Sequence, residues 1–204
     1  NNVSFTVPQR GEKKHLLDLS VMNVKQYKVD KLKQAEKLNP EQRSTRLLKE
    51  IQETLHLPKL PVHIECFDNS NIQGSDAVAA CVVFKMAKPS KKDYRHFNVK
   101  TVEGPDDFAS MYEAVYRRYK RLSEENQPLP DLVVVDGGKG QLSAACEALR
   151  DLQLNLPIIG IAKRLEEIFF PDDPIPLYLD KNSESLRLIP VSYTHLTLPT
   201  NSLV

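Results

Sequence analysis

Residues 132–142 read Leu-Val-Val-Val-Asp-Gly-Gly-Lys-Gly-Gln-Leu, and they give the clearest indication of how the chain folds. Four apolar residues in a row, ended by an aspartate, are typical of a buried strand. The glycines that follow indicate a tight turn. Beyond the turn, apolar residues recur at helical spacing at Leu142, Ala145, Leu149 and Leu152. A strand that turns at once into a helix predicts an α/β fold.

Three strand-like runs precede this unit. Val62–Phe67 alternates with period two, Ala77–Phe84 is a continuous apolar run, and Arg95–Val102 alternates again. Short loops join the three runs, which predicts an antiparallel meander. A helix then leads to the strand before Asp136, and residues 157–161 form a last strand. The order βββ-α-β-α-β resembles a ribonuclease H-like core, a mixed sheet flanked by helices, and this is the fold class we expect.

The helix before the strand at 132–135 begins with an acidic first turn and carries an apolar stripe. The stripe consists of Phe108, Met111, Tyr112, Val115, Tyr119 and Leu122. Basic residues lie beside it, and we interpret them as the solvent-facing side of the helix: Arg117, Arg118, Lys120 and Arg121. We therefore expect the stripe to face the sheet.

The chain divides by pattern into three parts. Residues 1–61 are mostly helical and locally basic, so we expect a basic helical extension that ends at Pro58 and Pro61. Residues 62–189 carry the α/β pattern and form the expected core. Residues 190–204 contain two prolines and no charged residue, and we interpret them as a non-native tail.

Composition excludes several classes of protein. The chain has 28 Lys and Arg against 27 Asp and Glu, so its net charge of +1 excludes a polycation that coats nucleic acid, although not a local basic face. No apolar run reaches the roughly 18 residues of a membrane span, so we expect no membrane partner. Cys66, Cys81 and Cys146 have apolar neighbours and no CxxC spacing, which indicates reduced thiols of a cytoplasmic protein rather than a zinc site.

Two aspartates stand where strands end. Asp68 and Asp136 each follow a predicted strand and precede a turn, which puts a carboxylate at the mouth of the sheet. If the two strands are neighbours, the two carboxylates can share a divalent cation, Mg²⁺ or Mn²⁺, which activates water toward a phosphodiester. The alternative is that both residues only cap turns, because aspartate is common after strands.

Four segments carry a resemblance to a known family. Glu65-Cys-Phe-Asp-Asn-Ser70, Tyr94-Arg-His-Phe-Asn98, Gly104-Pro-Asp-Asp-Phe-Ala109 and Val135-Asp-Gly-Gly-Lys-Gly-Gln-Leu142 occur in this order. Together they resemble the C-terminal endonuclease half of the UvrC family, the incision subunit of bacterial nucleotide excision repair, over roughly residues 1–189.

The resemblance implies a ribonuclease H-like nuclease that cuts the damaged DNA strand on the 5′ side of a lesion. It makes Asp68 and Asp136 metal-binding catalytic residues and Asp107 a further acidic residue of the incision site. For Asp107, capping of the helix that it begins is the equal alternative. The implied partners are DNA, UvrB and the complex that UvrA loads.

Basic residues give candidate DNA contacts. Lys139 lies in the glycine turn beside Asp136, and Lys91, Lys92 and Arg95 belong to a positively charged loop that can follow a phosphate backbone. The alternative for each is an ordinary solvated side chain. The glycine turn lacks the Gly-Lys-Ser/Thr ending of a P-loop, so an ATPase is disfavoured.

The chain departs from the family after Ile189. Members continue with a basic helix that supplies a catalytic histidine, and then with a tandem helix-hairpin-helix DNA clamp. Neither pattern is present here, and His195 is not assigned the missing role. We therefore expect a metal-dependent endonuclease fragment that is incomplete and weakly active. The alternative function is a non-catalytic DNA-binding or assembly module that retains the fold.

Overall fold

The computed structural model of the chain describes residues 7–70, 78–98, 106–162 and 167–178. It divides into two compact units, Asn1–Arg43 and Ser44–Val204. The first unit contains helix α1, Gly11–Leu38, on which apolar side chains such as Leu16 and Met22 are exposed. Helix α2, Pro40–Thr54, begins at the Asn39-Pro40 pair, because the residue before a proline resists helical geometry.

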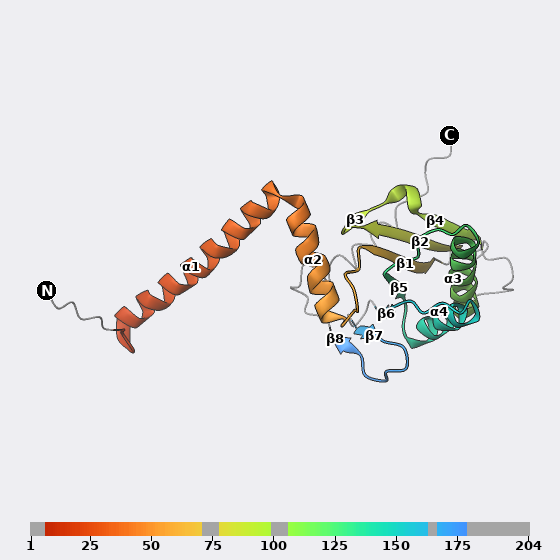
Figure 1. Ribbon diagram of the computed structural model, residues 1–204. Helices are drawn as coiled ribbons and strands as arrows, with labels where there is room; N and C mark the ends of the chain where they lie inside the picture. Colours follow the sequence, from red (N-terminus) through yellow and green to blue (C-terminus); the bar gives the residue numbers. More distant parts are fainter. Residues whose placement is uncertain (1–6, 71–77, 99–105, 163–166, 179–204) are drawn as a thin grey trace. The chain divides into compact units, whose positions relative to one another are not determined.

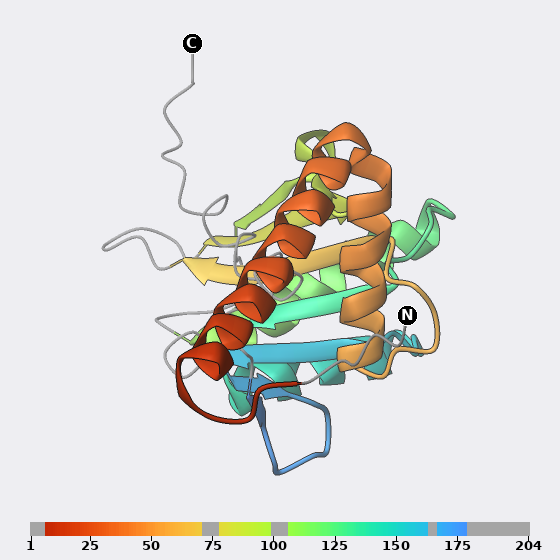
Figure 2. The same cartoon turned by 90° about the vertical axis from the view of Figure 1, so that its left-hand side faces the viewer.

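The second unit is built on a mixed sheet that has eight strands in the described residues (Figures 1 and 2). They are β1 His63–Ser70, β2 Val78–Lys85, β3 Lys88–Pro89, β4 Arg95–Asn98, β5 Leu132–Asp136, β6 Ile158–Ala162, β7 Glu167–Phe169 and β8 Leu177–Tyr178. The order across the sheet is β3-β2-β1-β5-β6-β7-β8, and β4 also pairs with β2.

Strand pairing confirms the expected meander and adds three strands, β3, β7 and β8, to the prediction. β2 pairs antiparallel with β1 and with β4, whereas β5 runs parallel to both β1 and β6. β7 and β8 continue the sheet antiparallel beyond β6. They are three and two residues long, too short to show a period in the sequence. The 3₁₀ turn η1, Lys91–Asp93, leads into β4.

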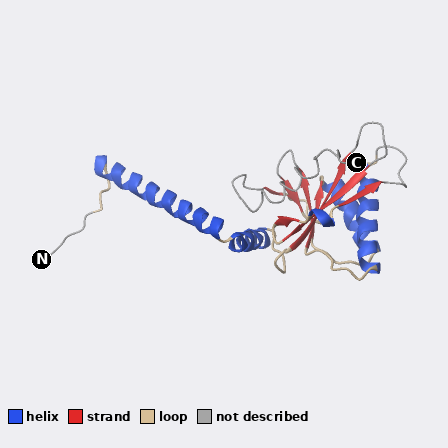
Figure 3. Ribbon diagram, turned by 90° about the horizontal axis from the view of Figure 1, so that it is seen from above, coloured by secondary structure: helices blue, strands red, loops and turns tan. Residues whose placement is uncertain are grey.

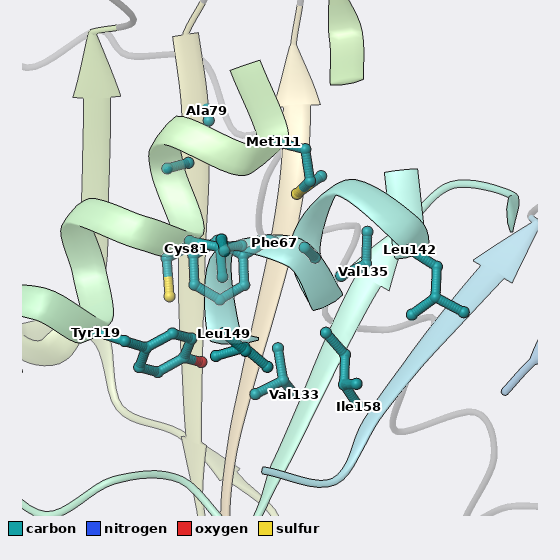
Figure 4. Close-up of a cluster of buried hydrophobic side chains, with 14 of the residues drawn as sticks. Phe67, Ala79, Cys81, Met111, Tyr119, Val133, Val135, Leu142, Leu149 and Ile158 are labelled. Carbon is teal, nitrogen blue, oxygen red and sulfur yellow. The ribbon is translucent and has the colours of Figure 1, made fainter. Parts of the chain in front are cut away.

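Helices α3, Asp107–Glu124, and α4, Lys139–Asp151, pack on one face of the sheet (Figures 1 and 3). Their apolar stripes meet the inward side chains of β1, β2 and β5 in one buried cluster (Figure 4). Phe67 of β1 lies edge-on to Tyr119 of α3, with 5.9 Å between ring centroids. The stripe of α3 therefore faces the sheet as expected.

The second buried cluster lies on the other face of the same strands. Leu48 and Ile51 of α2 are fully buried and pack with Ile64, Cys66 and Val134. The sequence pattern ends the helical extension at Pro61 and begins the core after it, whereas the compact unit of the structure begins at Ser44. The reason is that α2, which the sequence pattern assigns to the N-terminal extension, supplies apolar side chains to the core.

Two sequence features lie outside the described residues. These are the tail 190–204 and, within it, His195. In the part of the chain that is described, no helix is long and apolar enough to cross a membrane. In the same described ranges Cys66, Cys81 and Cys146 form no disulfide, and the first two are buried, as their apolar neighbours predict.

Candidate active site

The strands that carry Asp68 and Asp136 are neighbours. β1 and β5 pair in parallel from Ile64 opposite Leu132 to Phe67 opposite Val135. The two aspartates are the next residue on each strand, so they reach the same edge of the sheet at the same level. Both are half-buried. A shared cation requires the two strands to be neighbours, and in the structure they are.

Both aspartates also leave the sheet on the same face. Phe67 and Val135, one residue earlier, are buried in the cluster beneath α3 and α4. Because successive side chains of a strand alternate between faces, Asp68 and Asp136 point to the side of Cys66 and Val134. Two acidic side chains thus converge at the carboxyl end of the parallel strands.

Asp107 lies at the same edge but on the side of α3. It is the first residue of α3, and the capping role belongs to its neighbour: the Asp106 carboxylate accepts hydrogen bonds from the backbone N–H groups of Phe108 and Ala109, each at 3.0 Å. The Asn69 side-chain amide donates to the Asp107 carbonyl at 2.6 Å. The first turn of α3 is therefore attached to the end of β1 beside Asp68.

The donor set at this edge fits a hard divalent cation. Carboxylate oxygens are the ligands that Mg²⁺ and Mn²⁺ prefer, and Mg²⁺ commonly takes only one or two of them and fills its shell with water and substrate oxygens. Among the described residues, no three His, Cys, Asp or Glu side chains are close enough to hold a metal ion. The side-chain carbonyl oxygen of Asn69 is buried without a hydrogen-bond partner at the same strand end. A two-carboxylate site is therefore what the residues support.

The glycine turn after Asp136 redirects the chain into α4. Gly137 has a φ of +152°, and its N–H donates to the Ile161 carbonyl at 3.0 Å. A Cβ at Gly137 would lie 2.7 Å from the Gln141 side chain, so only glycine fits. The Lys139 ammonium donates to the Pro174 carbonyl at 2.9 Å and lies 5.6 Å from the centre of the Phe169 ring. It points away from β1, and its role as a phosphate contact stays a prediction.

The predicted basic contacts lie beyond β2. Arg95 pairs with Cys81, which pairs with Phe67, so Arg95 lies two strands from β1 at nearly the level of Asp68. Two strand spacings are about 10 Å. Lys91 and Lys92 belong to η1 and are exposed. The structure thus brings Arg95 closest to the carboxylate edge, and it places the two lysines farther along the sheet.

One group of buried charges was not predicted. Glu65 is fully buried on the α3 side of β1, and the Arg118 guanidinium donates to it twice, at 3.1 and 2.6 Å. Burial raises the pKa of Glu65, but hydrogen bonds from His63 and Arg118 outweigh it and lower the pKa below its ordinary value. The interpretation of Arg118 as solvent-facing is wrong, because Arg118 is spaced three and four residues from Val115 and Leu122 on the apolar stripe. That spacing was the available signal.

Comparisons with known proteins agree on one family. The family described as the UvrC RNAse H endonuclease domain matches residues 52–191. The UvrABC system protein C of Porphyromonas gingivalis strain W83 is 67% identical over 190 residues, which cover 92% of this chain and 32% of that protein. The Flavobacterium johnsoniae protein of the same name is 63% identical over 190 residues, with the same coverage. The chain spans about a third of the length of these relatives.

Among solved structures, similarity is distant. The match with the Endonuclease V of Ciona intestinalis, in complex with a DNA that contains an inosine, covers 80% of this chain and 67% of the Endonuclease V chain. The sequence identity is 17% and the TM-score is 0.40.

Proposed function

Because the chain belongs to the UvrC RNase H endonuclease domain family, we propose that it hydrolyses DNA phosphodiester bonds with Mg²⁺ or Mn²⁺ held by Asp68 and Asp136. The observation that carries this proposal is the parallel pairing of β1 with β5, which ends in an aspartate on each strand at the same level and on the same face. Family membership confirms the ribonuclease H-like fold and the endonuclease class.

The chain's own residues supply charge and rigidity. Asp68 and Asp136 bring two negative charges to one strand edge, where paired backbone holds their positions. A divalent cation bound there supplies Lewis acidity that activates water and offsets charge on the phosphodiester. Asp107 adds a third carboxylate on the α3 side of the edge, and Asn69 fixes the first turn of α3 by its hydrogen bond to the Asp107 carbonyl. In this role Asp107 supports the metal site from the α3 side of the edge, which is the side that faces the substrate in our proposal.

The DNA backbone follows the basic edge of the sheet in this proposal. Of the three basic residues beyond β2, Arg95 lies nearest the level of the carboxylate edge, on the α3 face with Phe67 and Cys81. Its guanidinium is held by the carbonyls of Lys92 and Tyr94 at 3.0 and 2.6 Å. Lys91 and Lys92 extend the positive charge away from the site. Lys139 lies on the other side of the carboxylate edge, and it can contact a phosphate there only if its hydrogen bond to the Pro174 carbonyl breaks. Contacts of this kind make binding fall as salt rises.

We assign the reaction to nucleotide excision repair, as the incision on the 5′ side of a lesion in the cytoplasm. The relatives of the chain are UvrABC system proteins, and this supports UvrB as the partner that delivers the damaged DNA. In our proposal this partner also selects the strand to be cut.

Binding of Mn²⁺ tests the metal site directly. Titration followed by calorimetry or by the electron paramagnetic resonance signal of free Mn²⁺ should show saturable binding by the wild-type chain. Asp68→Ala and Asp136→Ala should each abolish it, because each removes half of the carboxylate pair. Asp151→Asn is the matched control, since Asp151 is an exposed carboxylate at the far end of α4 that accepts a hydrogen bond from Tyr112.

The same titration separates the enzyme from the alternative module. DNA binding that is indifferent to Mn²⁺ and to both aspartate substitutions would favour a non-catalytic module and overturn the proposal. Mn²⁺ binding that survives Asp136→Ala would place the cation elsewhere.

A further inference from the structure

Phe108 is the exposed end of an otherwise buried stripe. On α3, Met111, Val115 and Tyr119 are fully buried, whereas 53% of Phe108 is exposed. A single exposed apolar residue is ordinary on a protein surface and needs no explanation by itself. The position of this ring, and the way it is supported, distinguish it.

The ring rests on a residue that has no side chain. A Cβ at Gly140, in the first turn of α4, would lie 2.6 Å from the Phe108 Cζ atom, so any other residue would displace the ring. Glycine is disfavoured inside a helix, and the close approach of Phe108 is a reason for it here. The ring is thus supported from one side by α4 and open to solvent on the other.

The backbone that carries the ring is fixed. The Phe108 N–H donates to the Asp106 carboxylate at 3.0 Å, which caps α3. The preceding residue, Asp107, accepts the hydrogen bond from Asn69 at the end of β1. An aromatic ring on a capped helix that is attached to the central strand loses little conformational freedom when it binds a ligand.

The ring lies between the elements that carry the acidic residues. It follows Asp107 directly, and its support, Gly140, is four residues after Asp136. The Asn69 amide lies 2.6 Å from the Asp107 carbonyl, which attaches the residue before Phe108 to the strand that carries Asp68. The ring therefore stands at the end of β1 that carries the carboxylates, on the α3 side of that edge.

We propose that Phe108 stacks on a nucleobase next to the phosphodiester to be cut, and so positions the DNA strand at the carboxylate edge. The inference rests on the proposed function. Stacking accepts any base because every base has an aromatic face. Such a contact therefore places no requirement on the sequence of the DNA.

The test compares two substitutions at Phe108 and one at Gly140. Phe108→Leu fills the space over Gly140 but has no aromatic face, whereas Phe108→Trp retains one. The probe is a single-stranded oligodeoxynucleotide that contains 2-aminopurine, whose fluorescence is quenched by stacking. Phe108→Leu should weaken binding about tenfold and abolish the quenching, whereas Phe108→Trp should keep both. Gly140→Ala should act like Phe108→Leu, because its Cβ displaces the ring.

Two controls separate this inference from the proposed function. Ile175→Ala removes an apolar side chain that is 73% exposed in the loop before β8, and it should leave DNA binding unchanged. Mn²⁺ affinity should be unaffected by all Phe108 variants. Wild-type DNA affinity in Phe108→Leu would overturn the stacking role while the metal site stands, and loss of Mn²⁺ binding in Phe108→Leu would show a structural role instead. Absence of Mn²⁺ binding in the wild-type chain would refute the proposed function itself.

Discussion

Replacing Arg118 by methionine should destabilise the sheet unit strongly, although the substitution removes no apolar contact. Two hydrogen bonds join the Arg118 guanidinium to Glu65, and the Glu65 side chain is fully buried. Arg118→Met leaves that carboxylate in the core without its cation. Removing one partner of a buried ion pair costs about 3–5 kcal/mol. We therefore expect the free energy of unfolding to fall by about 4 kcal/mol at neutral pH.

The loss should shrink as the pH falls. In the wild-type chain the pKa of Glu65 is lowered: burial raises it, but hydrogen bonds from His63 and Arg118 outweigh burial. Its stabilising contribution is therefore present above the unfolded pKa of about 4.3 and is lost as the pH falls through the folded pKa. In Arg118→Met, His63 remains 3.3 Å from the carboxylate, but burial acts without the guanidinium and raises the folded pKa. The stability of the variant is then highest below about pH 4.3, where the Glu65 carboxyl group is neutral, and it falls as the pH rises through that raised pKa.

Urea denaturation followed by circular dichroism, at several pH values from about 4.3 upward, measures both effects. Arg121→Met is the matched control, because Arg121 pairs with Glu125 at 2.7 Å on the exposed side of the same helix and should change stability by less than about 1 kcal/mol. The double variant Glu65→Leu/Arg118→Met should recover most of the loss. A cost below about 1 kcal/mol in Arg118→Met, or a cost that grows toward acid pH, would refute the reasoning.

Two further predictions concern α2 and the basic edge. Ile51 is fully buried in the cluster beneath α2, so Ile51→Ala should lower the free energy of unfolding by about 2–5 kcal/mol in the same urea assay; an unchanged midpoint would mean that α2 is no part of the core. The hydrogen bond from Lys85, at 2.7 Å, is the main cause that lowers the pKa of Asp93 to about 2. Lys85→Met should raise that pKa toward its ordinary value in a carboxyl NMR titration, and a pKa that stays near 2 would contradict the assignment.

The type and order of the main elements could be predicted because each is long enough to show a period. Alternation at 62–67, the apolar run 77–84 and the stripe on α3 each extend over at least six residues, and each corresponds to a described element. β7 and β8 are too short for such a signal. The spacing of Leu47, Leu48 and Ile51 indicates a helix with one apolar face, but it does not show that this face packs on the sheet beyond Pro61.

Contacts between distant residues are where local pattern fails. Glu65 and Arg118 are 53 residues apart in the chain, and the residues next to either one in the sequence do not indicate the other as its partner. The stripe on α3 predicts which side faces the sheet but not where the sheet stops, so the exposure of Phe108 follows only from the assembled structure. For the same reason the sequence could not show that Lys139 reaches the loop at Pro174.

The two aspartates were predictable because apolar residues fix their place. Phe67 and Val135 are fully buried side by side beneath α3 and α4. A slip of either strand by one residue would move its apolar side chains to the opposite face and expose them. The next residue on each strand is therefore held on the opposite face, at the edge, by the packing of apolar side chains that take no part in the reaction.

The same argument puts Asn69 on the α3 side, where its amide is bonded to Asp107. The carboxylate edge thus has an acidic face and a face that carries Phe108, and the strand register separates them. A substitution that disturbs the packing of Phe67 should for this reason weaken Mn²⁺ binding without touching either aspartate.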